Sequence, residues 1–485
     1  MLKAVLSAVI LIIAVILYTV YLFLKKNFNG LSWEEIVFHL KVPMKGTSNE
    51  MILDYFRTYG IRMGLGVCLS ILVSVVCYIK ISPSAGTALL VAAVVLLLLA
   101  IGSILQSFDT FGCLIAQGKE SGFIEEEAVQ LTPEMLHFPE KKRNLIYLFL
   151  ESMESTFSSK EEGGAMDKDR IPELTALAKE NIHFSSNEKL GGATPSRGAS
   201  WTTGAMVSQT CAYPVMIPLG GKNYQSEKNT FMPGAVSIGD VLKKEGYAQE
   251  IMVGSDLTFG GRKMYFEQHG DYFVYDYPYA KEKGKIPKDY YEWWGFEDKK
   301  LLAFAKEEIT KLAKGDKPFN FTMLTVDTHH IGGYVCEDCH QDFENNYDNV
   351  LSCSSKRVKE FIDWIKAQDF YKDTTIVISG DHCTMDNNYI RAQYDGSVPR
   401  RVYSCILNPA VESVREKDRK YYPMDLYPTT LAAMGVRVDG DRIGLGTNLF
   451  SDKKTILEKY GDAKVQQELS KGSSFYRKKI LGEKK

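Results

Sequence analysis

The 485-residue sequence predicts N-terminal transmembrane helices followed by an α/β domain with a mostly parallel sheet flanked by helices. Two observations support this fold class. Apolar runs long enough to cross a bilayer are confined to residues 1–106. Beyond them, short aliphatic runs alternate with amphipathic segments of helix length, which is typical of a buried parallel sheet with helical crossovers.

Three apolar runs are long enough to span a membrane, at about 5–24, 61–79 and 85–105. Together they define a membrane domain over 1–106. The first run is too long for the apolar part of a secretory signal peptide, and no small-residue cleavage site precedes Lys25 and Lys26. The loop over 25–58 contains an amphipathic stretch, LSWEEIVFHL, which is expected to lie in the membrane interface.

An odd number of spans places the N-terminus and the part of the chain after residue 106 on opposite sides of the membrane. Basic residues are more numerous in the 25–58 loop than in the 80–85 loop, which by the positive-inside rule favours a cytoplasmic α/β domain. The cysteines and the chemistry described below favour the extracellular or periplasmic side instead. We therefore expect a multi-pass protein of the cell membrane with its α/β domain outside.

Three regions follow the membrane domain: a connector helix over 107–141, the α/β domain over 142–452, and a Lys-rich tail over 453–485, expected as a surface helix with a frayed end. The predicted strands are NLIYLFLE, QEIMVGSD, FNFTMLTVD, TTIVISGD and RVYSCILN. Several of them end in an acidic residue, namely Glu151, Asp256, Asp327 and Asp381. Because sites in open α/β sheets form at the carboxyl ends of the strands, we expect these carboxylates to converge.

Charge and cysteine content narrow the functional classes. The net charge is -2 and no basic stripe stands out, so nucleic acid is not expected as a partner. Of the nine cysteines, Cys336, Cys339 and Cys353 crowd one segment. Outside the cell a loop-closing disulfide is favoured, from Cys339 or Cys336 to Cys353, with Cys339 as the assigned partner. A zinc knuckle that includes His340 is the alternative.

Two strand ends carry residue types that suit a divalent cation. Glu151 closes NLIYLFLESMES, and Asp381 and His382 close TTIVISGDHC. A carboxylate at one strand end and an Asp-His pair at another form a plausible ligand set. Taken separately, a strand-end aspartate is more often a helix cap and a lone histidine is usually structural.

Four motifs occur in a recognisable order: ESMES, GGATPSRGASWTTGAMVSQTCAYP, LTVDTHH and ISGDH. On this fold, behind membrane spans, the combination resembles the lipoteichoic acid synthase and phosphoglycerol transferase I family, and it looks closer to the phosphoglycerol transferase I branch. The resemblance covers about 142–452 and implies a sulfatase/alkaline-phosphatase-like domain. It also implies transfer of phosphoglycerol from phosphatidylglycerol to an extracellular polysaccharide or oligosaccharide. The implied metal ligands are Glu151, Asp381 and His382, with Mn2+ as the ion and Mg2+ or Zn2+ as alternatives.

The family's nucleophile is a threonine at a helix N-terminus, where a dication lowers the pKa of its hydroxyl and backbone N–H groups favour phosphate. Alignment on Trp201-Thr202 and on Cys211 to Pro214 puts Ala199 at this position. Either the register is shifted and Ser200 or Thr202 is the nucleophile, or the position has been changed, in a natural pseudoenzyme or deliberately. A deliberate Thr-to-Ala change in an intact site is the favoured interpretation, and Ser200 is the next candidate.

The resemblance assigns the remaining site residues. His329 matches a histidine that could protonate the leaving group, and His330 is expected to shape the pocket. Arg262 matches an arginine that grips the phosphate, while Asp256 is a weaker candidate for contact with glycerol hydroxyls. Where the family has a tryptophan beside that arginine, this sequence has Gly260.

Two alternative functions stay open. One is a phosphoethanolamine transferase or a phosphodiesterase/sulfatase of the same superfamily, although the stretch Thr194 to Arg197 matches the sulfatase signature only in scrambled form. The other is a catalytically silent, membrane-anchored protein that binds lipid or glycan, which Ala199 supports.

Overall fold

The computed structural model describes residues 2–80, 83–225 and 229–483. The chain forms two compact units. A helical unit contains the residues up to Trp33, Thr47–Ile115 and Met385–Asn388, and an α/β unit contains Glu34–Gly46, Ala116–Thr384 and the residues from Tyr389 onward. Each unit therefore includes a short segment that lies, in the sequence, among residues of the other.

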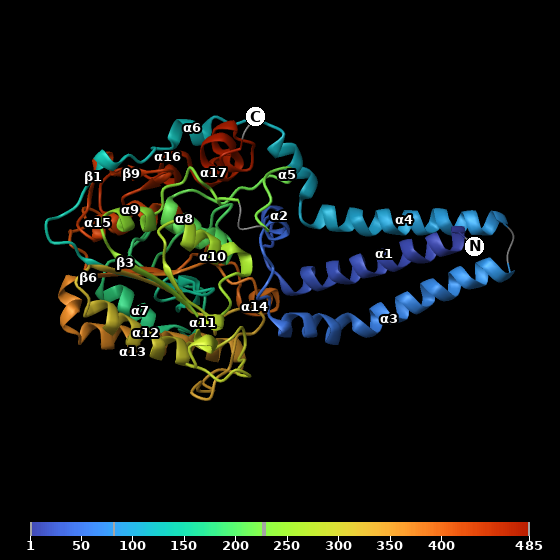
Figure 1. The fold of residues 1–485 in the computed structure, drawn as a ribbon, viewed down its shortest axis with the longest axis horizontal. Helices are drawn as coiled ribbons and strands as arrows, with labels where there is room; N and C mark the ends of the chain where they lie inside the picture. Colours follow the sequence, from blue (N-terminus) through green and yellow to red (C-terminus); the bar gives the residue numbers. More distant parts are fainter. Residues whose placement is uncertain (1, 81–82, 226–228, 484–485) are drawn as a thin grey trace. The chain divides into compact units, whose positions relative to one another are not determined.

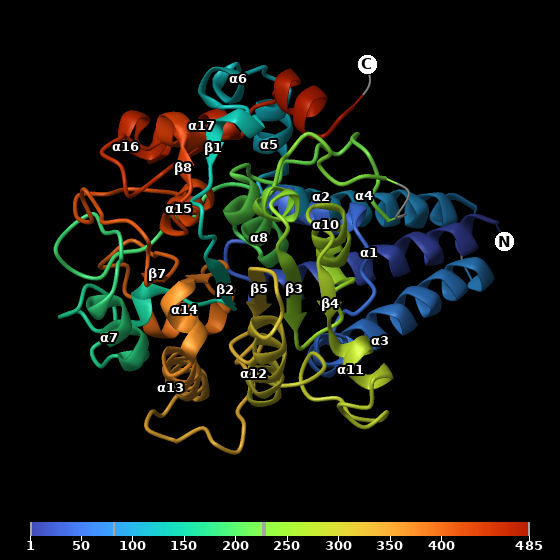
Figure 2. The same cartoon turned by 60° about the vertical axis from the view of Figure 1, so that its left-hand side comes forward.

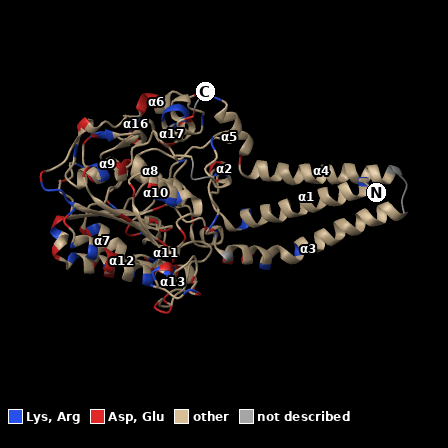
Figure 3. Ribbon diagram, in the orientation of Figure 1, with Lys and Arg blue, Asp and Glu red and all other residues tan. Residues whose placement is uncertain are grey.

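Three long helices form most of the helical unit: α1 (Leu2–Asn27), α3 (Asn49–Lys80) and α4 (Pro83–Ser107). Among the described residues, these are the helices long and apolar enough to cross a membrane, with mean hydropathies of 2.8, 2.0 and 3.0 over their most apolar stretches. Figure 3 shows that they carry few charged residues. Large apolar side chains such as Leu65 and Leu98 are exposed on them, as expected for helices that contact lipid. The three predicted spans fall within these helices.

The α/β unit is built on one six-stranded sheet with the order β4-β3-β5-β2-β6-β7 (Figure 2). Its strands are β2 (Asn144–Leu150), β3 (Ala248–Val253), β4 (Phe273–Tyr275), β5 (Phe319–Leu324), β6 (Thr374–Gly380) and β7 (Ser404–Leu407). The first five of these run parallel, and β7 pairs antiparallel with β6. The predicted fold class is confirmed.

Both faces of the sheet are buried, and the side chains of β2 alternate between two hydrophobic cores. Leu145, Tyr147 and Phe149 enter one core, and Ile146, Leu148 and Leu150 enter the other. The first core is covered by α8 (Thr202–Cys211), α9 (Ile238–Lys244), α10 (Arg262–Gln268) and α15 (Leu426–Ala433). The second is covered by α7 (Pro172–Glu180), α12 (Asp298–Ala313) and α13 (Asn346–Lys366), which lie on the opposite side of the sheet in Figure 1. Burial on both faces explains why the strands read as continuous apolar runs.

Strand register brings the carboxyl ends of β2, β5 and β6 together. Leu150 of β2 pairs with Gly380 of β6, so the next residues along the two strands, Glu151 and Asp381, are neighbours at one edge of the sheet. On the other side of β2, Phe149 pairs with Leu324 of β5. The loop that contains the LTVDTHH motif therefore starts beside Glu151.

The segment Glu34–Gly46, which includes most of α2 (Trp33–Lys41), belongs to the α/β unit. The Phe38 ring lies 5.4 Å from the Trp201 ring, the backbone N–H of Tyr224 donates to the carbonyl of Lys41, and that of Gly260 donates to the carbonyl of Pro43. The amphipathic stretch was expected in the membrane interface. Its buried apolar side chains instead pack on protein, because the start of α8 presents an aromatic partner.

The connector and the tail differ from the sequence-based expectation. In place of one helix over 107–141, the chain forms α5 (Thr110–Gln117), α6 (Phe123–Glu127) and the short strand β1 (Leu136–His137). The tail contains α16 (Ile456–Tyr460), α17 (Asp462–Leu469) and a π-helical turn over Tyr476–Ile480. Tyr476 and Leu481 are buried in the first core. The described part of the tail is therefore packed against the α/β unit, although it is rich in lysine.

The remaining elements are short. The helices are α11 (Tyr277–Glu282) and α14 (Asn387–Gln393), and the strands are β8 (Arg437–Val438), which pairs with β1, and β9 (Arg442–Ile443), which pairs with β10 (Gly446–Thr447). Single 3₁₀ turns cover Pro133–Met135, Ser155–Phe157, Phe259–Gly261, Asp369–Asp373, Pro423–Asp425 and Asp439–Asp441.

Candidate functional site

The three predicted metal ligands converge at the carboxyl ends of β2 and β6. His382 Nε2 lies 3.7 Å from Glu151 Oε1 and 3.4 Å from Asp381 Oδ2. One potential ligand atom from each residue lies within 4.8 Å of those of the other two, and all three side chains are buried. This separation is short enough for the three side chains to bind one ion.

Hydrogen bonds orient the side chains of Asp381 and His382 within this cluster. Asp381 Oδ1 accepts from the backbone N–H groups of Ser152 and His382, both at 2.7 Å, whereas its buried Oδ2 has no hydrogen-bond partner. His382 Nδ1 lies 2.9 Å from the carbonyl of Cys383, so a proton on Nδ1 leaves the lone pair of Nε2 directed at the carboxylates. A buried acceptor without a donor, beside an imidazole held in the metal-binding tautomer, fits a divalent cation.

The electrostatics of the cluster also favour a cation. Burial, and then the charge of Asp381, raise the pKa of Glu151. Burial lowers the pKa of His382, but the charges of Asp381 and Glu151 outweigh it, so the net shift is upward. Both upward pKa shifts mean that Glu151 and His382 bind protons more tightly, in a region where negative charge is concentrated. A dication would take the place of these protons.

Thr202 brings a hydroxyl group to this cluster. It is the first residue of α8, and its Oγ1 lies 3.3 Å from His382 Nε2. The next side chain, Thr203, points elsewhere and donates to the carbonyl of Gly260. Ala199 is buried in the loop before the helix, and Ser200 is half-buried beside it. Of these candidates for the nucleophile position, Thr202 is the one with a side-chain hydrogen bond to a predicted metal ligand.

Arg262 is fixed beside the cluster at the start of α10. Its Nε donates to the carbonyl of Phe259, and its Nη2 donates to Ser255 Oγ and to the carbonyl of Asp256. Burial lowers the pKa of Arg262, while the negative charge of Glu151 opposes this shift. An anchored, buried guanidinium that interacts with the carboxylates is suited to a bound anion. Asp256 itself accepts from the backbone N–H of Thr258, so its carboxylate caps the turn before α10.

His329 and His330 form one end of a row of aromatic rings. The two imidazoles stack with their centroids 4.5 Å apart, and Trp294 lies 4.5 Å from His329. Phe259 lies 5.5 Å from Trp294, and His39 stacks on Phe259 at 5.8 Å. Burial lowers the pKa of His329 to about 3, so this imidazole is neutral at physiological pH in the free protein. Trp294 and Phe259 supply aromatic surface next to Gly260, where the family resemblance led us to expect a tryptophan.

Several positioning residues were missed by the sequence analysis. The Glu151 backbone is held from both sides, since its N–H donates to Thr325 Oγ1 at 2.9 Å and its carbonyl accepts from Thr328 Oγ1 at 2.5 Å. The loop after His382 is held by Glu154, which accepts from the backbone N–H of Thr384 and pairs with Arg400. The second glutamate of ESMES and the threonines of LTVDTHH were signals for these roles, but nothing in their spacing distinguished them from surface polar residues.

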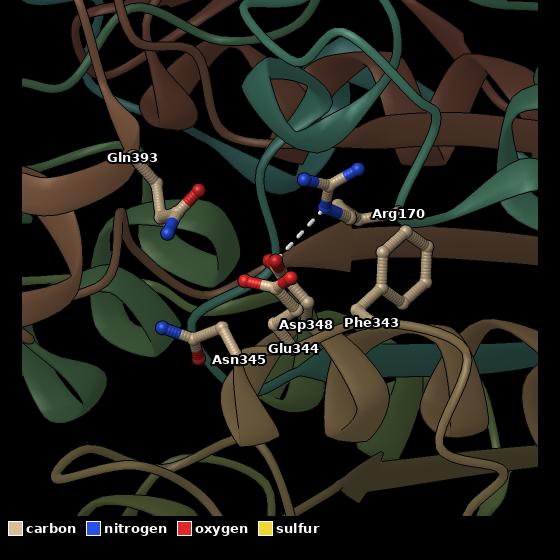
Figure 4. A pocket seen from close by; sticks show the side chains of 6 residues that line it. All are labelled: Arg170, Phe343, Glu344, Asn345, Asp348 and Gln393. Atoms are coloured by element: carbon tan, nitrogen blue, oxygen red, sulfur yellow. Dashed lines mark ion pairs between the residues drawn. The ribbon is translucent and has the colours of Figure 1, made fainter.

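A separate pocket of about 430 Å³ lies on the α/β unit (Figure 4). It is lined by Arg170, Phe343, Glu344, Asn345, Asp348 and Gln393. Arg170 Nε forms an ion pair with Asp348 Oδ2 at 3.1 Å, and its guanidinium lies over the Phe343 ring. None of the predicted site residues lines this pocket.

The cysteines assigned to a disulfide lie together with a third cysteine. Cys336 Sγ is 3.3 Å from Cys339 Sγ and 3.8 Å from Cys353 Sγ. All nine cysteines are free thiols in the structure. The disulfide between Cys339 and Cys353 therefore stays a prediction.

Comparisons with known proteins agree with the fold and the motif order. The family described as Sulfatase matches residues 143–436. Phosphoglycerol transferase I of Escherichia coli O6:K15:H31 (strain 536 / UPEC) is 32% identical over 302 residues, which cover 60% of this chain and 38% of that protein. Phosphoglycerol transferase I of Shigella boydii serotype 18 (strain CDC 3083-94 / BS512) has the same identity and the same coverage, 60% and 38%. The chain thus matches well under half the length of these relatives.

One solved structure extends the comparison of the fold. The lipoteichoic acid synthase LtaP from Listeria monocytogenes has a TM-score of 0.51 and 19% sequence identity, and the match covers 68% of this chain and 80% of that one. At this identity the likeness concerns the fold.

Proposed function

The chain belongs to the sulfatase family, and from this premise we propose that it transfers phosphoglycerol from phosphatidylglycerol to an extracellular glycan. The observation that carries the proposal is the meeting of Glu151, Asp381 and His382 with the Thr202 hydroxyl at the start of a helix. Relatives of this chain are named phosphoglycerol transferase I, which supports phosphoglycerol as the transferred group.

Glu151, Asp381, His382 and Thr202 would hold the cation. Carboxylate, hydroxyl and imidazole ligands suit Mn2+, the ion implied by the family, and also suit Mg2+ or Zn2+. When bound, the ion would supply positive charge that ionises the Thr202 hydroxyl and offsets the charge of the phosphoryl oxygens. Asp381 Oδ2 is buried without a hydrogen-bond partner, which supports its assignment as a metal ligand.

The proposed reaction has two displacements. Thr202 reacts as the alkoxide, its proton having passed to solvent, and His329 takes up a proton from solvent when the anionic substrate binds. In the first displacement, Thr202 Oγ1 forms a bond to phosphorus while the bond between phosphorus and the diacylglycerol oxygen breaks, and that oxygen takes the proton of the His329 imidazolium. In the second, a glycan hydroxyl attacks the same phosphorus, its proton passes to His329, and the Thr202 oxygen leaves. His329 is neutral in the free protein, and the negative charge of a bound phosphodiester raises the pKa of a neighbouring imidazole.

Arg262 would bind the phosphoryl group before and during both displacements. Its side chain is anchored through Nε and Nη2 to groups of its own loop, so little conformational entropy is lost when the anion binds. The ring row of Trp294, Phe259 and His39 would form the wall beside the glycerol. His330 would shape this wall, and Asp256 would act mainly by holding the turn before Arg262.

An extracellular or periplasmic α/β unit follows from the substrates, because the glycan acceptor lies outside the cell. The packing of Glu34–Gly46 within the α/β unit supports two membrane crossings between this segment and the rest of the unit. This segment precedes α3, and the rest of the unit follows α4, so both are on one side of the membrane if α3 and α4 each cross it. Attachment to the membrane would raise the effective concentration of a lipid donor.

The proposal is tested with the full-length protein in vesicles that contain phosphatidylglycerol labelled in its head group. We expect Mn2+-dependent release of diacylglycerol and appearance of the label on an added oligosaccharide. Label transfer from phosphatidylethanolamine instead would identify a phosphoethanolamine transferase, and turnover of an aryl sulfate alone would identify a sulfatase. Binding of lipid or glycan without any turnover would leave a silent binding protein.

A further inference from the structure

Cys336, Cys339 and Cys353 form a second cluster of potential metal ligands, on segments that do not contribute to the first. Cys336 and Cys339 lie in the loop after His330, and Cys353 lies on α13. One Sγ from each lies within 4.8 Å of the other two, and Cys336 Sγ is 3.3 Å from Cys339 Sγ and 3.8 Å from Cys353 Sγ. Two thiolates on a tetrahedral zinc ion, each at about 2.3 Å, are separated by about 3.8 Å. The separation of Cys336 and Cys353 equals this value, and Cys339 has to move about 0.5 Å away from Cys336 to bind the same ion.

The loop around Cys336 has the local form of a metal-binding knuckle. Two residues separate Cys336 from Cys339, which is the spacing of structural zinc sites. The backbone N–H of Cys339 donates to the carbonyl of Cys336, closing a tight turn. Within this turn the backbone N–H of Asp338 donates to Cys336 Sγ at 3.3 Å. An N–H group directed at a sulfur atom stabilises its thiolate form, which is the form that binds metal.

Arg357, one turn after Cys353 on α13, supplies a second layer of contacts. Its Nη2 donates to Cys336 Sγ at 2.9 Å and to Asp338 Oδ2 at 2.9 Å, and its Nη1 donates to Asp327 Oδ2 at 3.2 Å. The two carboxylates offset the charge of the guanidinium, so a dication next to it is less strongly repelled. Hydrogen bonds of this kind to ligand atoms hold metal ligands in place.

We propose that Cys336, Cys339 and Cys353 bind one zinc ion, with water in the fourth position. The ion joins the loop after His329 and His330 to α13. The same loop carries Phe343, which lines the pocket in Figure 4. A disulfide at Cys339 and Cys353 is incompatible with this ion, so the predicted bond and the proposed site exclude each other.

The test uses full-length protein purified in detergent without chelators and then exchanged with Co2+. Because the first cluster has no sulfur ligand, a thiolate-to-cobalt charge-transfer band in the near ultraviolet reports on the cysteines. We expect this band, and one bound metal equivalent more than in Cys353→Ser. Cys405→Ser is the matched control, since Cys405 is a buried thiol outside the cluster, and it should keep the band.

Two further measurements keep the result interpretable. Asp381→Asn, which removes a ligand of the first cluster, should leave the band unchanged. Cys339→Ser should lose the band as Cys353→Ser does, and near-ultraviolet circular dichroism verifies that each variant is folded. Absence of the band in folded parent protein overturns the proposal. In that case, an intact mass lower by two hydrogens shows a disulfide, and three alkylatable thiols show an empty cluster.

Discussion

Replacement of Thr202 by alanine separates the two interpretations of the nucleophile. Thr202 Oγ1 lies 3.3 Å from His382 Nε2, whereas Ala199 is buried in the preceding loop. If Thr202 is the nucleophile, Thr202→Ala removes the atom that attacks phosphorus. If position 199 is the altered nucleophile position, Ala199→Thr should instead create or increase turnover.

The size of each effect follows from the contacts. Thr202 makes one side-chain hydrogen bond and is half-buried, so Thr202→Ala should cost about 0.5–1.5 kcal/mol of folding stability. Its turnover should fall by at least about 10³-fold, which corresponds to about 4 kcal/mol in the barrier. Thr202→Ser keeps the hydroxyl and should stay within about tenfold of the parent, a difference of about 1.4 kcal/mol. Ala199→Thr adds two heavy atoms at a position that is 1% exposed, so it should destabilise the fold by about 1–3 kcal/mol without adding activity.

The assay measures diacylglycerol release from vesicles beside a thermal melt of each variant. The informative result is the pair of values, because a folding defect lowers the melting temperature and the rate together. Thr202→Ala should lose its rate with a melting temperature within a few degrees of the parent. The reasoning is refuted if Thr202→Ala turns over at the parental rate, or if Ala199→Thr gains activity.

Three other predictions concern the metal and the phosphate. Mn2+ at a hundredfold excess over Kd should raise the free energy of unfolding of the parent by about 2.7 kcal/mol, and a thermal melt should show the corresponding rise in melting temperature. The melting temperature of Asp381→Asn should not rise, and an equal shift in both proteins would place the ion elsewhere. Mn2+ should bind more weakly as pH falls, because the pKa values of Glu151 and His382 are raised and both side chains must lose protons to bind metal. Calorimetry in two buffers of different ionisation enthalpy counts the protons released on binding. If no proton is released, the assignment of these ligands is contradicted. Arg262→Lys should lower kcat/KM by about 10–100-fold, since a lysine cannot reproduce the anchoring through Nε and Nη2. An unchanged kcat/KM would show that Arg262 does not bind the phosphate.

The sequence was sufficient for the sheet and for the convergence of the predicted ligands at its edge, because both depend on simple patterns. A strand buried on both faces reads as an apolar run, and the residue that follows it lies at the carboxyl edge. Glu151 and Asp381 were found in this way, and the pairing of Leu150 with Gly380 then determines that they are adjacent.

Other features depend on contacts between distant segments, which no local pattern records. The sequence left Ala199, Ser200 and Thr202 as candidates for the nucleophile position, and the contact of Thr202 Oγ1 with His382 joins two segments 180 residues apart in the sequence. LSWEEIVFHL packs on the aromatic side chain of Trp201. An amphipathic pattern alone does not indicate whether the apolar face of a helix contacts protein or lipid. The many lysines of the tail likewise predicted an exposed segment, whereas Tyr476 and Leu481 are buried.

The placement of Glu34–Gly46 also bears on how a soluble form of the α/β unit can be made. A fragment that begins after α4 would leave behind Phe38 and Val42, which are 1% and 0% exposed in the whole chain. Water would then reach Trp201, directly before Thr202, and the side of Phe259 on which His39 stacks. Truncation after the last span would therefore expose Trp201 and Phe259 next to the proposed site, and joining residues 34–46 to the fragment through a flexible linker should cover these side chains again.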